Sequence, residues 1–289
     1  MHQLSKWMRA VRVPTLSASV IPVALGGILG YGASSFNLFK IILAAISVTF
    51  FQITANLIND VDDFKNKVDT KESLGSSRVI VDGLLTPKQM TFAAKIFFLT
   101  AVAIGIYLTA VSGLVILALG ALGAASAYFY TRKPFQFKYK GYGVPIIFLM
   151  FGPLPVLGSY YLSTGTMALN PVLLSIPVGL LTTAILHAND LRDIDYDAKA
   201  GIKSFAMVLG RRWARRFYLA LIAASFICIL IFVLTGLVTY WSLLVLLALP
   251  PAVMLIKPSG SPNMIKAIDH KTAAVQMLFG LLLLISIAL

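Results

Sequence analysis

The chain has 289 residues, of which 58% are hydrophobic and only 12% are charged. Soluble domains carry about 25% charged residues, so this composition excludes a soluble globular protein and predicts an integral membrane protein. The net charge of +13 is spread between apolar segments, which argues against nucleic acid as a partner and for contact with lipid headgroups. A single cysteine, Cys228, excludes a disulfide framework and a thiolate metal site.

Uncharged stretches predict the membrane spans, each of which needs about 20 apolar residues. Three of the stretches are long enough for two spans and contain a glycine-bearing break. The sequence therefore predicts an all-α bundle of nine transmembrane helices in a single membrane domain, 1–289. The expected spans are 14–33, 39–59, 91–111, 114–131, 144–162, 170–188, 216–235, 239–256 and 270–289.

Basic residues between the spans predict the orientation. Every Lys and Arg except Lys40 falls in the N-terminal segment or in the loops after the second, fourth, sixth and eighth spans. Positive charge marks the cytoplasmic side, so we expect the N-terminus and these loops there, with the protein in the inner or plasma membrane. In the first long loop, Thr86-Pro87 predicts a helix start, because a capping hydroxyl precedes proline at the first helical position.

The acidic residues are few and clustered. All except Asp269 lie within 60–82 or 190–197, on the side predicted to be cytoplasmic. The stretch Asn59-Asp60-Val61-Asp62-Asp63 recurs approximately as Asn189-Asp190-Leu191-Arg192-Asp193, and each copy follows an even-numbered span. This repetition predicts two pseudo-repeated halves with a site between them. The Asp-rich cytoplasmic loops are expected at about 60–90 and 189–215.

Two pairs of carboxylates are expected to converge. Asp60 and Asp63 are three residues apart and Asp193 and Asp197 are four apart, so each pair shares a helical face. Carboxylate and amide oxygens suit Mg²⁺, which often bridges to substrate phosphates. Two Mg²⁺ ions and a diphosphate would neutralise the four carboxylates, and the metal would assist diphosphate departure. If the donor is an allylic lipid, the apolar bundle would shelter the carbocation that departure leaves.

Two cations follow small residues that let backbone N–H groups approach an anion. Arg78 follows Gly75-Ser76-Ser77, and Lys203 follows Gly201-Ile202. We expect both to grip the diphosphate. Near the loop after the fourth span, a group of tyrosines either stabilises a cation through ring faces or forms an interfacial belt. Its members are Tyr128, Tyr130, Tyr139 and Tyr142.

These motifs resemble the UbiA superfamily of intramembrane aromatic prenyltransferases over nearly the whole chain. The resemblance implies nine transmembrane helices and two Asp-rich motifs that bind Mg²⁺ and the prenyl diphosphate. Asn59, Asp60 and Asp63 match the first motif. Asp193 and Asp197 match the second, and the family's Gly-x-Lys-Ser/Thr follows at Gly201-Ile202-Lys203-Ser204.

Within the family, the chain is most similar to the 1,4-dihydroxy-2-naphthoate polyprenyltransferases of menaquinone biosynthesis. The likeness is carried by Arg9-Ala10-Val11-Arg12, Asn56-Leu57-Ile58-Asn59-Asp60, Gly83-Leu84-Leu85-Thr86-Pro87 and Leu191-Arg192-Asp193-Ile194. It implies a prenyl diphosphate donor and a small aromatic acceptor that loses its ring carboxylate on prenylation. Besides these two substrates, the lipid bilayer is the expected partner.

The resemblance and the residue chemistry together assign a site. The expected catalytic residues are Asp60, Asp63, Asp193 and Asp197. The expected metal ligands are these four with Asn59 and Asp69. The expected substrate-binding residues are Asn56, Asn59, Arg78, Tyr139, Asn189, Arg192 and Lys203.

Two departures from the family pattern leave alternatives open. Lys67 stands where the family usually has the last Asp of the first motif, and Asp69 is the candidate replacement. Val144 stands where the naphthoate enzymes have Glu, so 4-hydroxybenzoate, a chlorophyll or haem precursor, or a lipid are alternative acceptors. A different class, a divalent-cation or anionic-metabolite transporter, would use the acidic clusters as a gated site. The length of the prenyl chain depends on tunnel depth, which no motif encodes.

Overall fold

The computed structural model describes residues 3–73, 75, 77–255 and 267–289, and this part of the chain is almost entirely helical. The first helices are α1 (Gln3–Ala10), the 3-10 helix η1 (Val13–Thr15), α2 (Ser17–Leu29), α3 (Leu38–Lys65), α4 (Pro87–Ser112) and α5 (Leu114–Phe129). The next are η2 (Lys138–Lys140), α6 (Gly143–Phe151), α7 (Pro153–Thr164) and α8 (Leu169–Lys199). The last are α9 (Phe205–Leu234), η3 (Tyr240–Ala248), α10 (Leu249–Met254) and α12 (Ile268–Ala288).

Six segments of the described chain are long and apolar enough to cross a membrane: α3, α4, α6 with α7, α8, α9 and α12. The pair formed by α1–η1 and α2, bent by 49°, makes a seventh if it counts as one span. Two shorter apolar helical segments are α5 and η3 with α10. Each of the nine predicted spans overlaps one of these segments. The all-helical class is confirmed, and the count of nine membrane crossings stays a prediction.

Local sequence signals explain where several helices begin and end. The Thr86 hydroxyl accepts from the backbone N–H of Gln89 at 3.2 Å, and the Gln89 side chain accepts from the Thr86 N–H at 2.9 Å. This capping box starts α4 and confirms the predicted helix start. Gly113, with φ of 96°, separates α4 from α5, and Gly165, with φ of 70°, ends α7. Both breaks fall where the sequence predicts them, because glycine tolerates positive φ.

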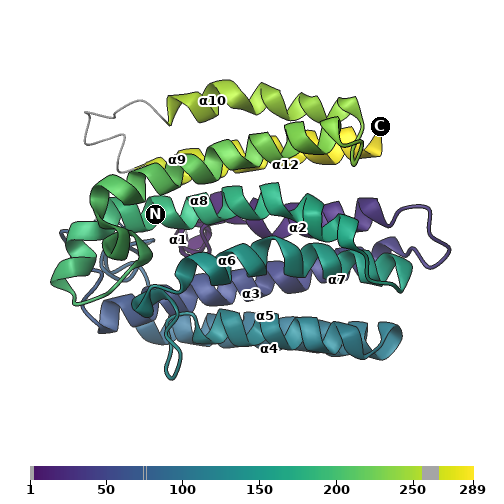
Figure 1. Ribbon diagram of the computed structural model, residues 1–289. Helices are drawn as coiled ribbons and strands as arrows, with labels where there is room; N and C mark the ends of the chain where they lie inside the picture. The colour runs from purple at the N-terminus through teal and green to yellow at the C-terminus, as the bar shows by residue number, and fades with distance from the viewer. Residues whose placement is uncertain (1–2, 74, 76, 256–266) are drawn as a thin grey trace.

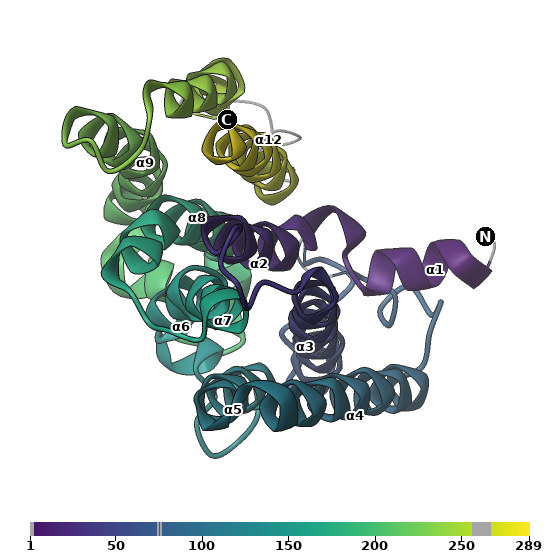
Figure 2. The ribbon, with the colours of Figure 1, turned by 90° about the vertical axis from the view of Figure 1, so that its right-hand side faces the viewer.

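The first half of the bundle is a ring of helices, and the second half is built around α8. Around the ring, α2 packs on α3, α3 on α4, α4 on α5, α5 on α7, and α7 back on α2 (Figure 2). In the second half, α8 packs on α9 and α12, and α12 packs on η3. Contacts of α2 with α8 and α12 join the halves. Their apolar core includes Leu25, Leu181, Phe226 and Phe279.

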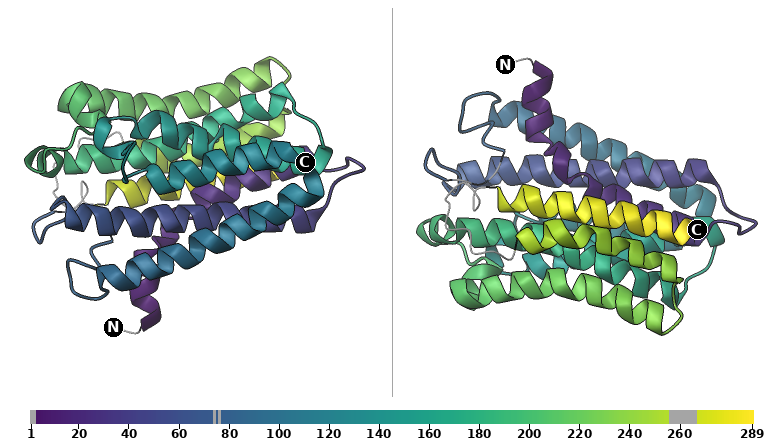
Figure 3. Two further views of the ribbon diagram at one scale, coloured as in Figure 1. Left: turned by 90° about the horizontal axis from the view of Figure 1, so that it is seen from below. Right: turned by 90° about the horizontal axis from the view of Figure 1, so that it is seen from above.

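The longest loops, which follow α3 and α5, lie at one end of the bundle, and the opposite end carries the extended loop 30–37 and shorter turns (Figures 1 and 3). The loops after α3, α5 and α8 share one end, and α1 lies across the bundle there. At 28 and 31 residues, α3 and α8 are about 42 and 46 Å long. Both exceed a hydrocarbon core of about 30 Å. Their last turns therefore carry the two acidic motifs to the loop end of the bundle. The prediction that these motifs lie in loops, at about 60–90 and 189–215, is wrong for their first residues, because Asn59–Asp63 and Asn189–Asp197 are helical.

Candidate active site

The Asp63 carboxylate, near the C-terminal end of α3, is buried and held by three side chains. The Tyr139 hydroxyl donates to Oδ1 at 2.7 Å, Lys138 Nζ lies 2.5 Å from Oδ2, and the Asn59 amide also donates to Oδ2. Burial alone would lower the pKa of Lys138, but Asp63 and further carboxylates raise that pKa above its ordinary value, so the ammonium keeps its charge. Burial and the Asp63 carboxylate raise the pKa of Tyr139, so its hydroxyl stays a donor.

Asp60, one turn earlier on α3, is held separately. Arg12 Nη2 lies 2.5 Å from Asp60 Oδ1, and the Ser77 hydroxyl donates to Asp60 Oδ2. Arg12 has a φ of 58° in the bend between α1 and α2, a conformation that is uncommon outside glycine. Asn59 and Asp63 line the main cavity of the described structure, whereas Asp60 lies beside it. The predicted pair is thus neutralised by two different cations.

The loop after α3 folds back under that helix. The Asp69 backbone N–H donates to the carbonyl of Asp63 at 3.2 Å. Asp69 is buried and lines the cavity, whereas Lys67 is exposed. The loop therefore places Asp69, the candidate replacement ligand, at the cavity and leaves Lys67 exposed.

Arg78 and Lys203, the two cations expected to grip a diphosphate, lie outside the cavity lining that the structure describes. The Arg78 guanidinium donates to main-chain carbonyls of its own loop, including that of Ser73, and lies 3.5 Å from Asp82. Lys203 is exposed. In this structure Arg78 orders the loop, and contact of either side chain with a substrate stays a prediction.

The second acidic motif lies on the face of α8 that lines the cavity. Asp193 and Asp197 both reach the cavity, as their spacing of four residues predicts. Arg192 donates from Nε and Nη2 to the two oxygens of Asp193 at 2.9 and 2.8 Å. Asn189 also lines the cavity, as does Asp190, which the sequence analysis did not assign.

One cavity of about 850 Å³ connects the two motifs. Its polar end holds Asp63 on one side and Asp193 with Asp197 on the other. Away from these residues, α4, α5 and α7 supply small and apolar walls, among them Val102, Gly105, Gly120, Gly123, Leu154, Gly158 and Leu162. The cavity is thus acidic at the loop end of the bundle and apolar along its length.

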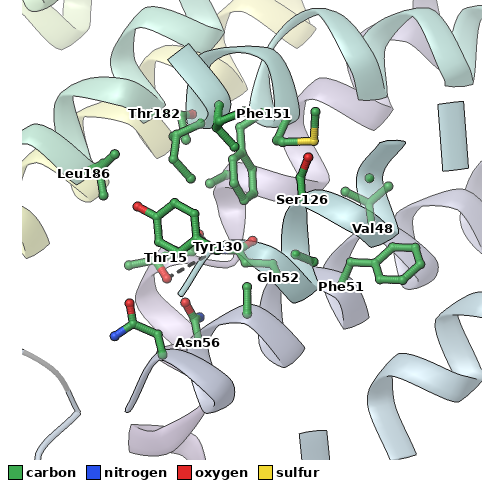
Figure 4. Close-up of a pocket in the computed structure, with 18 of the residues that line it drawn as sticks. Thr15, Val48, Phe51, Gln52, Asn56, Ser126, Tyr130, Phe151, Thr182 and Leu186 are labelled. Carbon is green, nitrogen blue, oxygen red and sulfur yellow. Dashed lines mark hydrogen bonds between the residues drawn. The ribbon is translucent and has the colours of Figure 1, made fainter. Parts of the chain in front are cut away.

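The cavity is also lined by uncharged polar residues, most of which belong to no predicted motif (Figure 4). Gln52 donates to the carbonyl of Thr15 at 2.9 Å, and the Asn56 amide donates to a main-chain carbonyl at 3.2 Å. The Tyr130 hydroxyl is buried with no hydrogen-bond partner among the described residues. A polar residue inside an apolar span, such as Gln52, is the signal that would have found this group.

The donor set fits Mg²⁺ in a specific way. Within the described ranges, no three His, Cys, Asp or Glu side chains form a group that holds a metal by itself. Mg²⁺ usually takes one or two carboxylates and completes its shell with water and substrate phosphate oxygens. The residues fit that form, because carboxylates from both motifs face one cavity and all their donors are hard oxygens.

The chain matches known sequences over most of its length. The profile of the UbiA prenyltransferase family matches residues 19–260. The 1,4-dihydroxy-2-naphthoate octaprenyltransferase of Bacillus subtilis (strain 168) is 32% identical over 280 residues, which cover 96% of this chain and 90% of that protein. UbiA prenyltransferase domain-containing protein 1 of Gallus gallus is 33% identical over 292 residues, which cover 100% and 86%.

Solved structures share the fold. A UbiA homolog from Archaeoglobus fulgidus bound to GPP and Mg²⁺ superposes with a TM-score of 0.60 at 20% identity, covering 96% of this chain and 99% of that one. The apo structure of a UbiA homolog from Aeropyrum pernix K1 gives 0.68 at 17% identity, covering 93% and 97%. The matching profile, the relatives above 30% identity and the shared helical fold agree, and the chain belongs to the UbiA prenyltransferase family.

Proposed function

We propose that this protein transfers a polyprenyl group from a prenyl diphosphate to a small aromatic acceptor in an Mg²⁺-dependent reaction. The observation that carries the proposal is one cavity whose lining includes carboxylates of both motifs together with an extensive apolar wall. A diphosphate with an isoprenoid tail has the same division into charged and apolar parts. The active site would face the cytoplasm, since Lys and Arg concentrate in the loops at that end.

The carboxylates would hold the ions that bind the donor. Asp63, with Asn59 and Asp69, would serve on the α3 side, and Asp193 with Asp197 on the α8 side. Bound Mg²⁺ supplies charge neutralisation and Lewis acidity for departure of the diphosphate.

Three cations now paired with these motifs would help to hold the diphosphate. Arg12 pairs with Asp60, Lys138 with Asp63, and Arg192 with Asp193. A guanidinium or ammonium that shares its carboxylate with a metal ion is free to donate to phosphate oxygens, which accept strong charge-assisted hydrogen bonds. Asp60 would act beside the cavity by keeping Arg12 at its rim.

The rest of the cavity would bind the prenyl chain and the acceptor ring. In the reaction the allylic carbon–oxygen bond breaks and diphosphate leaves, a carbon–carbon bond forms to the electron-rich ring, and the ring loses a proton or, where it bears a carboxylate, CO₂. The chain's contribution is to exclude water and to hold the ring at the allylic carbon, and such positioning supplies much of the rate. Tyr130 and Asn56 line the cavity near each other (Figure 4), and the two reactants would meet beside them.

The acceptor that we favour is 1,4-dihydroxy-2-naphthoate, which places the protein in menaquinone biosynthesis. The relatives from Bacillus subtilis and Escherichia coli (strain K12), each 32% identical, are named for that substrate. Val144 is buried at the start of α6, so 4-hydroxybenzoate, a chlorophyll or haem precursor, and a lipid are kept as alternatives. Ion or metabolite transport is not carried forward, since the family is one of prenyltransferases.

Product analysis tests this function directly. We expect the purified protein, incubated with Mg²⁺, prenyl diphosphates of several lengths and a panel of aromatic acids, to yield a prenylated naphthalenediol that mass spectrometry identifies. Chelation with EDTA is expected to reduce product to background, and excess Mg²⁺ to restore it, because diphosphate departure needs the metal charge. Absence of product from every aromatic acceptor, with folded protein and Mg²⁺ present, would contradict the proposal.

Exchanges at positions 69 and 67 test whether Asp69 supplies the last ligand of the first motif in place of the Asp that Lys67 replaces. Asp69→Asn is expected to lower kcat/KM by roughly 10²-fold, because it removes a buried carboxylate from the diphosphate end. Lys67→Ala is the matched control, two residues away and exposed, and should change kcat/KM by less than about twofold. Steady-state kinetics over a Mg²⁺ series provide the measurement. Equal effects of the two changes would show that Asp69 does not replace the missing ligand.

A further inference from the structure

Arg192 joins two carboxylates that come from distant parts of the chain. Its Nε and Nη2 hold both oxygens of Asp193, its neighbour on α8, and its Nη1 lies 2.8 Å from Oδ2 of Asp269. Asp269 lies in the first turn of α12 and is the acidic residue outside the two clusters. The arginine side chain is only 4% exposed, so its charge depends on these partners.

Asp193 has two competing partners. In the function proposed above, on which this inference rests, Asp193 binds the metal ion of the donor, although Arg192 now occupies both of its oxygens. The guanidinium does not lose its proton, and a buried charge that loses its counterion is strongly destabilising. When Asp193 turns to the metal, Arg192 therefore needs a second carboxylate.

We propose that Asp269 is a positioning residue that holds Arg192 in the site while Asp193 binds the metal. It would anchor Nη1, so that the Nε–Nη2 edge is presented to an oxyanion of the substrate. Planar guanidinium edges suit bidentate recognition of phosphate and carboxylate. Asp269, Arg192 and Asp193 all line the cavity, so this edge is within reach of a ligand there.

The groups around Arg192 limit where its guanidinium can point. A Cβ atom built on Gly75 would lie only 3.1 Å from Arg192 Nη2, so the loop backbone closes one side of the guanidinium. On another side stands Asp269, whose Oδ1 is buried and has no hydrogen-bond partner among the described residues. The Asp269 carboxylate thus holds Arg192 and, within the described chain, no other hydrogen-bonding group.

The oxyanion has two possible sources, the donor diphosphate and a carboxylate on the aromatic acceptor. Both would be read by the same guanidinium edge. Calorimetric titration of the full chain in detergent with inorganic pyrophosphate and Mg²⁺ probes the first. Titration with 1,4-dihydroxy-2-naphthoate probes the second, and steady-state kinetics give KM for each substrate.

Asp269→Asn is the test, and Asp195→Asn is its control. Asp195 is on the same helix as Arg192 and pairs with Arg211 at 2.7 Å, but that pair is exposed. We expect Asp269→Asn to weaken the binding of one of the two ligands about tenfold, because Arg192 loses the charged partner of its Nη1, and to raise the matching KM more than it lowers kcat. Asp195→Asn should leave both binding constants unchanged.

If Asp269 acts through Arg192, the effects of substituting these two residues on ligand binding are not additive. In an Arg192→Gln background, adding Asp269→Asn should change neither binding constant further. If Asp269→Asn alone does not fold, folding of the double variant supports the proposal, because both buried charges are then gone. The proposal would be overturned if neither the single nor the double variant folds. It would also be overturned if Asp269→Asn weakens binding equally in the unsubstituted and Arg192→Gln backgrounds, or if it leaves binding unchanged. Absence of prenyl transfer by the unsubstituted chain would instead count against the proposed function.

Discussion

Replacing Asp63 or Asp193 with alanine is expected to abolish prenyl transfer. Each carboxylate lines the acidic end of the cavity, on opposite sides of the space in which the diphosphate would lie. Loss of either would remove a metal ligand from one side, and the charge of the departing diphosphate would be poorly neutralised. We expect kcat/KM to fall by at least roughly 10³-fold. Product formation is measured by mass spectrometry at saturating Mg²⁺.

The two replacements are expected to differ in stability. Asp63→Ala leaves the Lys138 ammonium without its nearest carboxylate, and breaking a partly buried pair in this way is destabilising. Asp193→Ala leaves Arg192 paired with Asp269, so its thermal unfolding in detergent should be closer to that of the unsubstituted protein.

Asparagine at either position keeps the size of the side chain and separates loss of chemistry from loss of folding. Asp195→Asn, on an exposed carboxylate of α8, is the control and should retain activity. Near-normal turnover by a folded Asp63 or Asp193 variant would remove that residue from the metal site.

Much of the fold follows from local sequence features. Apolar runs locate the helices, and capping or glycine signals at Thr86, Gly113 and Gly165 fix several of their ends. Two predicted spans are less regular than hydropathy predicts: 144–162 is interrupted at Gly152-Pro153, a dipeptide that favours a helix break, and 239–256 begins as a 3-10 helix. Both segments are uncharged and mainly apolar, and hydropathy alone does not report helix geometry.

The site is predictable where it is continuous in sequence and obscure where it is assembled by packing. Spacing alone places Asp193 and Asp197 on one face of α8, and both reach the cavity. Arg12 and Lys138 come from other segments and pair with α3 only through tertiary structure. Arg78 shows the reverse case, because a cation beside an acidic motif in sequence turns to its own loop.

The apolar part of the cavity explains how the enzyme would select the length of its donor. Gly105 on α4 and Gly120 on α5 line the cavity, and a Cβ atom added to either would meet no atom within 4 Å. Both positions lie within helices, where a side chain in place of glycine gains up to about 1 kcal/mol of helix propensity. Larger residues there would occupy the space intended for the prenyl chain without forcing the helices apart.

Gly120→Phe is therefore expected to shift donor preference toward shorter prenyl diphosphates. An overfilled apolar site typically costs about 1–3 kcal/mol, so kcat/KM for the longest accepted donor should fall by roughly 5- to 150-fold. A donor with one or two isoprene units would not reach the new ring and should stay within about threefold of normal. Leu122→Phe is the control on the same helix, since Leu122 is 56% exposed and lies outside the described cavity lining. Competition between mixed-length donors, read by mass spectrometry, gives the ratio directly. An equal loss for short and long donors would show that Gly120 does not border the path of the chain.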